Sequence, residues 1–366
     1  MKNAVIYGEF LEESTTGIAY INSLLERVLY DLGYEVSRFS EPRVKDYKNI
    51  KEIVNKKFYF KDFIKIIFGL LRSKKKEISF ITISQSNLGL IKTLIISIIL
   101  KYKTKRLIIY VHRGDLKSNI NKFYFRKFMI NLLFSISCKV IFLSKILSKD
   151  FKNNHHHNKF LIIPNSLNKK DTNKSKILYE KNFIKRNLFK ENTYRAIYCG
   201  NIHSQKGIDK IVLAIEQINK NHKDKNVILD VYGIPFEKIN EINNQIKYKG
   251  ILNYRNRLEI MSKYDFLITA SKSEGMPLIL IECLSIGLPF ITTDVGAIKD
   301  ILIRDYPYIC TCTKKSILNT INNLINDFEN QNEKVKKIIS HGNKLYRDNF
   351  QYKNYYANIK KNIFLD

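Results

Sequence analysis

The sequence predicts an α/β protein made of two doubly wound units, each a parallel sheet with helices on both faces. Short apolar runs alternate with amphipathic helical stretches along both halves of the chain. A polar stretch rich in Asn, Lys and Glu, residues 171–194, separates the two halves. The 366 residues, 45% of them hydrophobic, are enough for two domains of ordinary size with a core each.

The first half begins with an apolar run, Ala4–Tyr7, that is typical of a strand. A helix is expected over Gly17–Leu32, because Ile18, Ile21 and Leu25 recur at helical spacing and a glycine follows. Later apolar runs without alternation predict buried parallel strands. These runs are Ile78–Ser84, Arg106–Val111, Lys139–Leu143 and Phe160–Ile163.

The second half repeats the strand and helix pattern after the polar stretch. Strands are expected over Ala196–Cys199, Val227–Tyr232, Phe266–Thr269 and Phe290–Thr293, and helices over Gly207–Asn221, Asn253–Tyr264 and Pro277–Ile286. We therefore predict a first domain over residues 1–170, a connection over 171–194, a second domain over 195–340 and a C-terminal helix over 341–366. Ligands of such sheets bind beyond the carboxyl ends of the strands.

Charge and cysteine content narrow the classes of function. The net charge of +29 suggests a negatively charged partner, although a Lys-rich solvated surface explains part of it. No nucleic-acid-binding motif is present, so we expect no nucleic-acid partner. The odd number of cysteines, five, without CxxC or a zinc spacing, indicates reduced thiols in a cytoplasmic protein and no metal site. The start of the chain lacks the apolar run of a signal peptide.

Residues 273–287, SEGMPLILIECLSIG, are the most informative stretch. Pro277 and Gly287 are start and stop signals for an apolar helix, and a helix start suits a phosphate group. Glu274 and Glu282 lie eight positions apart, about two helical turns, and carboxylates accept hydrogen bonds from hydroxyls. A sugar nucleotide has both kinds of group. The alternative is a pair of solvated surface carboxylates, but Glu residues that flank so apolar a helix are seldom buried without a partner.

The string E-G-x-P-L-x-x-x-E, followed by G-x-P, resembles the signature of the family 4 retaining glycosyltransferases, also known as glycosyl transferases group 1. The resemblance is strong over residues 195–303 and weak over 1–170. It implies the GT-B fold, in which two Rossmann-like domains face each other across a cleft and the C-terminal helix returns to the first domain. It also implies transfer of a hexose or N-acetylhexosamine from a nucleoside diphosphate sugar to a hydroxyl, without a metal cofactor.

The resemblance assigns a role to each part of this string. Glu282 is expected to bind the ribose hydroxyls, and Glu274 the sugar hydroxyls near the reacting carbon. The backbone amides of the following segment are expected to hold the diphosphate, so the donor-binding set also contains Gly275, Met276, Pro277 and Leu278.

A second motif, C-G-N-I-H-S-Q-K-G, lies between a strand and a helix at residues 199–207. Lys206 matches a family lysine that holds the diphosphate, and we expect it to be catalytic. Asn201 stands where the family usually has Arg, so one phosphate cation is missing at this donor-binding position. Arg113, Arg255 and Arg257 are the candidates to replace it. The alternative for Lys206 is an ordinary surface lysine.

Three further positions follow from the resemblance. His112, at the end of a predicted strand, resembles the family histidine that contacts the donor sugar, so we expect it to be catalytic together with Lys206 and Glu274. The alternative is a structural histidine. Its neighbour Arg113 is a candidate to bind an acceptor phosphate. Gly17 and Gly250 are expected to border the donor, and the alternative for Gly17 is a plain helix start.

Family members of this kind in bacteria build O-antigen, capsule, lipopolysaccharide and related surface polysaccharides, so a lipid-linked saccharide acceptor is expected. Residues 56–76 fit this, because Phe60, Phe63, Ile67 and Leu71 share one helical face and lysines line another. A second stripe runs from Phe125 to Leu133. We expect a peripheral protein at the inner face of the cytoplasmic membrane, bound to its anionic surface. The alternative is that both stripes face the domain core.

Two other classes of function remain open. The chain could be a basic, non-catalytic binding module, which would leave the motif at 273–287 without a role. It could also be a GT-B epimerase or phosphorylase, which a product assay would distinguish.

Overall fold

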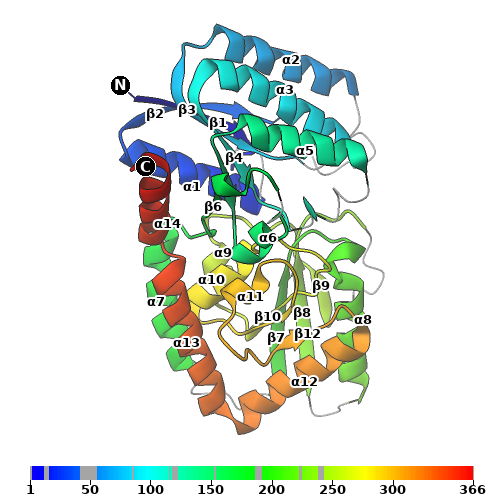
Figure 1. Cartoon of the computed structure of the whole chain (residues 1–366). Coiled ribbons are helices and arrows are strands. Elements are labelled where there is room, and N and C mark those ends of the chain that lie inside the picture. Colours follow the sequence, from blue (N-terminus) through cyan, green and yellow to red (C-terminus); the bar gives the residue numbers. More distant parts are fainter. Residues whose placement is uncertain are drawn as a thin grey trace. The chain divides into compact units, whose positions relative to one another are not determined.

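The computed structural model describes residues 2–11, 16–41, 56–84, 86–114, 116–117, 123–151, 154–185, 192–221, 225–237 and 243–365. The chain forms two compact units. The first comprises residues 1–165 together with 355–366, and the second comprises residues 166–354. Each unit contains one parallel sheet of six strands with helices packed against it (Figure 1).

The first sheet has the order β2-β1-β3-β4-β5-β6. Its strands are rich in Ile, Val and Phe because both faces of a parallel sheet are buried by helices. They are β1 (Lys2–Gly8), β2 (Tyr34–Ser40), β3 (Lys76–Thr82), β4 (Thr104–Val111), β5 (Lys139–Phe142) and β6 (Phe160–Ile162).

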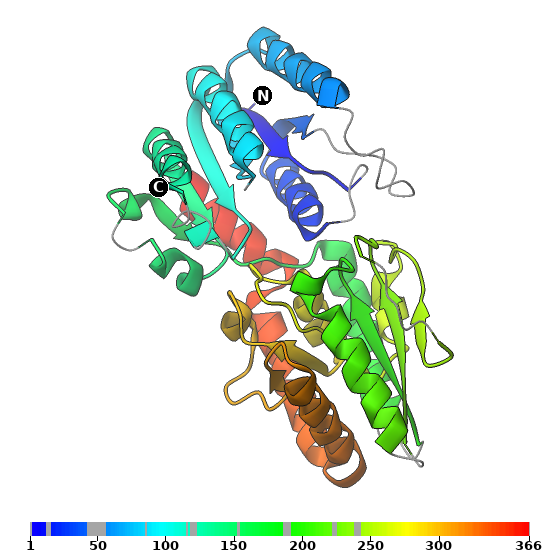
Figure 2. The same ribbon diagram turned by 90° about the vertical axis from the view of Figure 1, so that its right-hand side faces the viewer.

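Helices of the first unit lie on both sides of this sheet. Figure 2 shows α1 on one side and a layer of α2, α3 and α5 on the other. The helices are α1 (Gly17–Asp31), α2 (Lys56–Arg72), α3 (Asn87–Lys103), α5 (Tyr124–Ile136) and the short α6 (Lys145–Lys149). The order of elements is therefore the alternating one that the sequence predicts.

The last residues of the chain belong to the first unit. The helix α14 (Tyr352–Ile359) and a final π-helical turn (Lys360–Phe364) follow α13 (Asn332–Asn349). Arg106 donates a hydrogen bond from Nη1 to the carbonyl oxygen of Ile363 at 2.6 Å, and the rings of Tyr34 and Phe364 lie 5.0 Å apart. Tyr355 is completely buried, with its hydroxyl 3.5 Å from that of Tyr110. The tail is thus part of the core of this unit.

The second sheet has the order β12-β11-β10-β7-β8-β9. Its strands are β7 (Thr193–Cys199), β8 (Asn226–Tyr232), β9 (Ile246–Tyr248), β10 (Phe266–Ile268), β11 (Phe290–Thr293) and β12 (Ile309–Cys310). The helices are α7 (Lys169–Lys185), α8 (Ile208–Asn221), α9 (Arg257–Met261), α10 (Leu278–Ile286), α11 (Ile298–Ile301), α12 (Lys314–Asn330) and α13. The strand order reverses between β7 and β10, the place where open α/β sheets bind ligands.

The structure differs from the sequence prediction at several elements. The segment 171–194 contains most of α7, although the sequence predicts only a connection there. Over residues 169–183, whose burial is described, Asp171, Ser175 and Asn182 are the buried residues of this helix. It therefore lacks the apolar periodicity from which a helix is predicted. Strands β2 and β12 were not predicted, and the helix expected over Asn253–Tyr264 is limited to α9.

The five cysteines are all free thiols, with Cys283 and Cys310 buried. None of the described helices combines the length and apolarity needed to cross a membrane.

We predict that Tyr355→Ala lowers the free energy of unfolding by about 3 kcal/mol or more, because it removes a fully buried aromatic ring. Urea unfolding followed by circular dichroism would measure the change. Lys360→Ala, at an exposed position of the same tail, is the matched control and should leave the midpoint unchanged. Equal midpoints for the two variants would show that the tail is not part of the core.

Candidate active site

The loops that follow β7 and β10 enclose a small cavity at the point where the strand order of the second sheet reverses. Its volume is about 40 Å³, and its lining comes from both loops and from the start of α10. The lining residues are Tyr198, Cys199, Gly200, Lys206, Thr269, Ser271, Glu274, Pro277, Ile279 and Ile298. The two sequence motifs at 199–207 and 273–287 therefore meet at one place.

A charged pair lies at this cavity. Lys206 Nζ is 2.6 Å from Oε1 of Glu274, and the same oxygen accepts a hydrogen bond of 2.6 Å from the Ser271 hydroxyl. The side chains of Lys206 and Glu274 keep 32% and 19% of their exposure. Because both remain in contact with solvent, a ligand can replace one partner of the pair at low cost. The site thus offers an ammonium group and a carboxylate to an incoming polar molecule.

Backbone contacts hold the loop that carries Glu274. The amide of Lys272 donates to the carbonyl of Gln205 at 2.9 Å, and Thr293 Oγ1 donates to the carbonyl of Ser271 at 2.6 Å. Gly296 has a left-handed φ of 61°, and a β-carbon there would lie 1.8 Å from the carbonyl oxygen of Glu274. These contacts were not predicted, because nothing in the sequence shows which residues of other strands the loop touches.

The start of α10 differs in detail from the prediction. Pro277 is the N-cap residue and Leu278 is the first helical residue, with no side chain capping the start. Proline has no amide hydrogen, so Pro277 cannot supply one of the expected phosphate-binding amides. Gly275, Met276 and Leu278 are the residues of the predicted segment that carry one.

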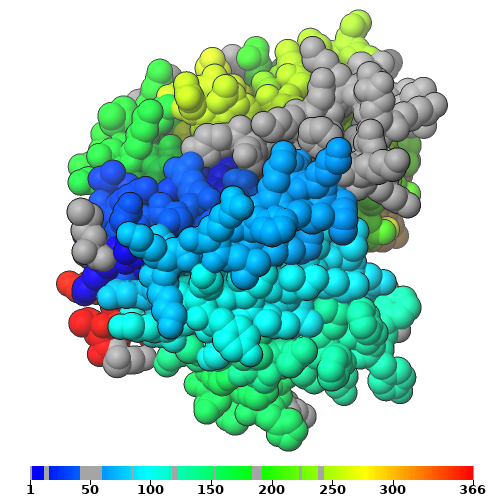
Figure 3. Space-filling model, turned by 90° about the horizontal axis from the view of Figure 1, so that it is seen from above, coloured from blue at the N-terminus to red at the C-terminus, as the bar shows by residue number. Residues whose placement is uncertain are grey.

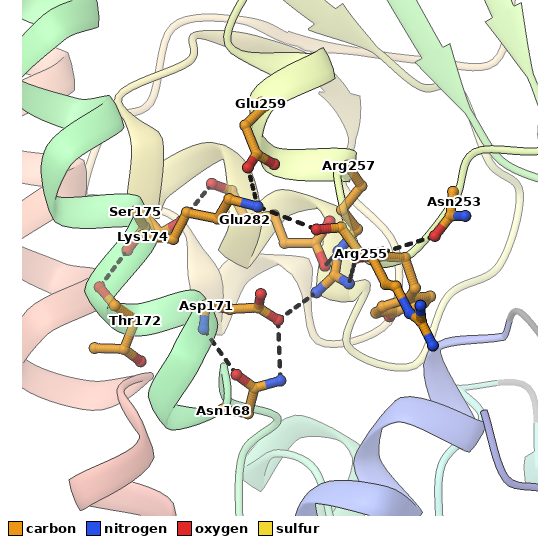
Figure 4. Close-up of polar contacts among 12 residues, drawn as sticks. Asn168, Asp171, Thr172, Lys174, Ser175, Asn253, Arg255, Arg257, Glu259 and Glu282 are labelled. Atoms are coloured by element: carbon orange, nitrogen blue, oxygen red, sulfur yellow. Dashed lines mark hydrogen bonds and ion pairs between the residues drawn. The ribbon is translucent and has the colours of Figure 1, made fainter. Parts of the chain in front are cut away.

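Glu282 lies on the buried side of α10, within a second charged cluster (Figure 4). Its Oε1 accepts a hydrogen bond of 2.5 Å from Nε of Arg257, and its exposure is 1%. Nη2 of the same guanidinium donates to Oδ2 of Asp171 at 3.2 Å, and Nη1 donates to the carbonyl of Tyr254 at 3.0 Å. Burial raises the pKa of Glu282 to about 7, while Arg257 acts in the opposite direction.

The structure shows where two of the arginines lie that were expected to replace the cation missing at position 201. Arg257, one of the candidates, is bonded to Glu282 and Asp171 inside the unit, so its guanidinium is already neutralised. Arg255 is exposed, and Figure 4 shows its side chain pointing away from this cluster. Asn201 is exposed, and its carbonyl accepts a hydrogen bond of 2.8 Å from the hydroxyl of Tyr198.

Residues 180–345 match the family model described as Glycosyl transferases group 1. This match spans most of the second unit. An uncharacterized glycosyltransferase of Methanocaldococcus jannaschii is 26% identical over 263 residues, which cover 69% of this chain and 67% of that protein.

The whole chain also resembles solved structures at low sequence identity. Sucrose-phosphate synthase from Thermosynechococcus elongatus has a TM-score of 0.73 at 14% identity, covering 99% of this chain and 98% of that one. HepE from Anabaena, in complex with UDP-glucose, has a TM-score of 0.65 at 13% identity, covering 98% of both chains. The fold is thus the two-domain Rossmann-like GT-B fold, and the matched domain indicates a transferase enzyme.

The first unit of the chain carries the predicted residues His112 and Arg113. His112 directly follows β4, is 8% exposed and stacks on the ring of Tyr110 at 4.1 Å. Its buried Nε2 has no hydrogen-bond partner among the described residues. Burial lowers the pKa of His112 to about 3, so the imidazole is neutral at physiological pH. Arg113 next to it is exposed.

Two glycines complete the predicted set. Gly17 is exposed and is the first residue of α1, which Thr16 caps by accepting a hydrogen bond from the amide of Ala19 at 3.2 Å. The Thr16 hydroxyl donates to the buried carboxylate of Glu9 at 2.6 Å. Gly250 follows β9 with a φ of 83°, and no atom of the described residues lies within 4 Å of where its β-carbon would be. The roles of all these residues toward a donor stay predictions of the family resemblance.

We predict that Gly296→Ala lowers the stability of the second unit by clearly more than Gly250→Ala. Both positions have a left-handed φ, so both variants carry a backbone cost of about 1 kcal/mol. Only position 296 adds a clash with the backbone of Glu274. Thermal unfolding of the two variants would measure the difference. Similar losses in both would mean that the close approach of Gly296 to the Glu274 loop does not constrain it.

Proposed function

We propose that this enzyme is a retaining glycosyltransferase that moves a hexose or N-acetylhexosamine from a nucleoside diphosphate sugar to a hydroxyl group. The observation that carries the proposal is the pair Lys206–Glu274 at the reversal point of the second sheet, beside the start of α10. A diphosphate needs a cation, and a sugar needs carboxylate acceptors for its hydroxyls. The HepE structure contains UDP-glucose, which supports a donor of this class.

The proposed chemistry needs only groups of the protein and its two substrates. The bond between the anomeric carbon and the diphosphate breaks, and the acceptor oxygen forms a new bond to that carbon on the same face. The acceptor proton passes to an oxygen of the leaving diphosphate. Lys206 and the amides at the start of α10 stabilise the negative charge that develops there, and Glu274 orients the sugar. In this proposal these groups stabilise the negative charge that a metal ion would otherwise stabilise.

The proposed acceptor is a lipid-linked saccharide, as in the synthesis of O-antigen, capsule or a related surface polysaccharide. A surface of the first unit supports this proposal. Twelve of the twenty exposed large apolar side chains in the described part of the chain belong to α2, α3 and α5 or directly precede α5. They are Phe60, Phe68, Leu71, Leu88, Ile91, Ile95, Ile98, Tyr102, Phe123, Tyr124, Phe125 and Phe128, which we call the apolar helix surface.

Helix α3 packs against both α2 and α5, so these side chains lie on neighbouring helices (Figure 3). The expected stripes are only partly exposed. Phe63, Leu70, Met129 and Leu133 are buried in the core, whereas Phe60, at 64%, and Phe128, at 65%, remain in solvent. Exposed lysines such as Lys61, Lys74 and Lys75 border them. We propose an anionic bilayer as the partner of the apolar helix surface, because apolar side chains among lysines match both its interior and its charge.

A screen of nucleoside diphosphate sugars by thermal shift, followed by product analysis on the donor that binds, tests the proposed function. A bound ligand raises the unfolding temperature by mass action. A stabilising nucleotide sugar with transfer to an acceptor is the expected result. Binding without turnover would favour a non-catalytic module, and an epimerised or phosphorolysed sugar would favour the other GT-B activities.

With the identified donor, we predict that Lys206→Ala lowers kcat/KM by at least about thirtyfold, or about 2 kcal/mol, because the leaving diphosphate loses its cation. Glu274→Ala should lower kcat more than it raises KM. Steady-state kinetics measure both effects. Lys210→Ala, which removes an exposed lysine paired with Asp209, is the matched control and should keep wild-type kinetics. Wild-type activity in Lys206→Ala would contradict the site assignment.

We predict that the protein floats with vesicles that contain anionic lipid and not with neutral vesicles, and that binding weakens as salt increases. The triple variant Lys61→Glu, Lys74→Glu, Lys75→Glu should lose binding, because each lysine near the surface contributes about 1 kcal/mol. Phe128→Ser should also weaken it.

The control carries the same change of charge on exposed residues of the second unit, Lys315→Glu, Lys337→Glu and Lys353→Glu. Its flotation should stay close to that of the wild type. Equal losses in both triple variants would mean that net charge alone binds the lipid, and the apolar helix surface would then not be the docking site.

A further inference from the structure

Arg257 is an almost completely buried cation that does not line the cavity. Its side chain is 5% exposed, and its charged centre lies 3.6 Å from the ring centroid of Tyr254. The guanidinium connects three helices, because it belongs to α9, Glu282 to α10 and Asp171 to α7 (Figure 4). Asp171 is in turn held by Asn168, whose Nδ2 donates to Oδ2 at 3.1 Å. Such a guanidinium fixes the position of each carboxylate that it binds.

Glu282 needs a nearby cation for the role that the family resemblance gives it. A carboxylate with 1% exposure and no cation beside it takes up a proton rather than stay charged. A protonated carboxyl group has lost part of its capacity to accept hydrogen bonds from two hydroxyls. Arg257 bonds only Oε1, and no hydrogen bond joins Oε2 to a described residue.

We propose that Arg257 is a positioning residue for donor binding, which keeps Glu282 ionised and oriented so that its second oxygen receives the ribose diol of the nucleotide. This inference rests on the proposed function, since it concerns the nucleotide part of the donor. The cluster holds two carboxylates and one guanidinium, so its net charge is negative when all are ionised. A neutral diol supplies hydrogen-bond donors without adding negative charge, whereas a phosphorylated ribose would be repelled.

The titratable groups that face Glu282 allow a pH test. They are Arg257 and Tyr254 from the segment at α9, Asp171 from α7 and Cys199 from β7. Burial raises the pKa of Tyr254 and of Cys199, so both stay neutral near pH 7. Asp171 raises the pKa of Glu282, whereas Arg257 lowers it. Removing the charge of Arg257 should therefore shift the pH dependence of nucleotide binding to higher pH, and removing the charge of Asp171 should shift it to lower pH.

The competing explanation is that Arg257 only ties helices together. The chain offers a control for it. Lys174 of α7 forms an ion pair with Glu259 of α9 and donates to the carbonyl of Arg255 at 3.1 Å. Lys174→Gln therefore removes a polar link between the same two helices and leaves Glu282 untouched.

The experiment measures the affinities of UDP, ADP and GDP and of their 2′-deoxy counterparts by calorimetry between pH 6 and pH 9. For the base that binds, the wild type should prefer the ribonucleotide by about tenfold or more at pH 8, because one hydrogen bond to a charged group is lost with the hydroxyl. This preference should fall as the pH drops below about 7, where Glu282 takes up a proton.

Arg257→Gln should bring the ratio of the two dissociation constants close to one at pH 7 and restore it only toward pH 9. Arg257→Lys keeps a charge but not the fork of donors. Its ratio of dissociation constants at pH 7 should therefore lie between those of the wild type and Arg257→Gln. Asp171→Asn should keep the preference at lower pH than the wild type does. Lys174→Gln should change stability but not the ratio.

An unchanged ratio in Arg257→Gln, or an equal loss of affinity for both nucleotides, would overturn the proposal and leave Arg257 a purely structural residue. A wild type that binds without any preference for ribose would also overturn it. A wild type that binds none of the three nucleotides would instead contradict the proposed function. If circular dichroism shows that Arg257→Gln does not fold, Arg257→Lys and Asp171→Asn test the proposal instead. The proposal then requires the preference for the ribonucleotide to shift to higher pH in Arg257→Lys and to lower pH in Asp171→Asn.

Discussion

The candidate site depends on backbone segments that approach each other more closely than any side chain would allow. A β-carbon at Gly207 would lie 2.3 Å from the carbonyl oxygen of Ala270, and one at Gly296 would lie 1.8 Å from that of Glu274. The loops after β7, β10 and β11 are therefore packed directly on one another. This packing brings Lys206 within 2.6 Å of Glu274, although the two residues are far apart in the sequence. The chemistry of the site thus follows from where the chain has glycine.

The two charged clusters of the second unit are suited to different tasks. The pair Lys206–Glu274 is partly exposed, so water replaces a lost partner and the pair opens cheaply for a ligand. The cluster around Arg257 is almost completely buried, and leaving one of its charges unpaired would cost several kcal/mol. The first arrangement suits groups that must rearrange during a reaction. The second suits a carboxylate whose position and charge have to stay fixed while ligands come and go.

The sequence predicts those features whose cause is local. Alternating strands and helices follow from apolar periodicity, so most element positions agree with the structure to within a few residues. Two buried polar residues show where prediction from the sequence fails. Asp171 lies in α7, which has no apolar face to reveal it, and Arg257 is only one of three arginines that the sequence offers as a phosphate cation. Arg257 is explained by its partner Glu282 and Asp171 by its partner Arg257, and nothing local to either residue identifies that partner.

The helices of the first unit show that the sequence also does not predict which apolar residues of a helix are buried. The stripe expected along residues 56–76 assumed one apolar face, either buried or exposed. In the structure α2 divides its apolar residues, since Phe63 and Leu70 pack into the core while Phe60 and Phe68 face solvent. Helix α3 also has a row of aliphatic residues in contact with solvent. Lysine content alone does not separate a docking surface from a solvated one, because both are basic. The concentration of exposed aromatic and aliphatic side chains on three neighbouring helices is therefore the feature that supports the proposed docking surface.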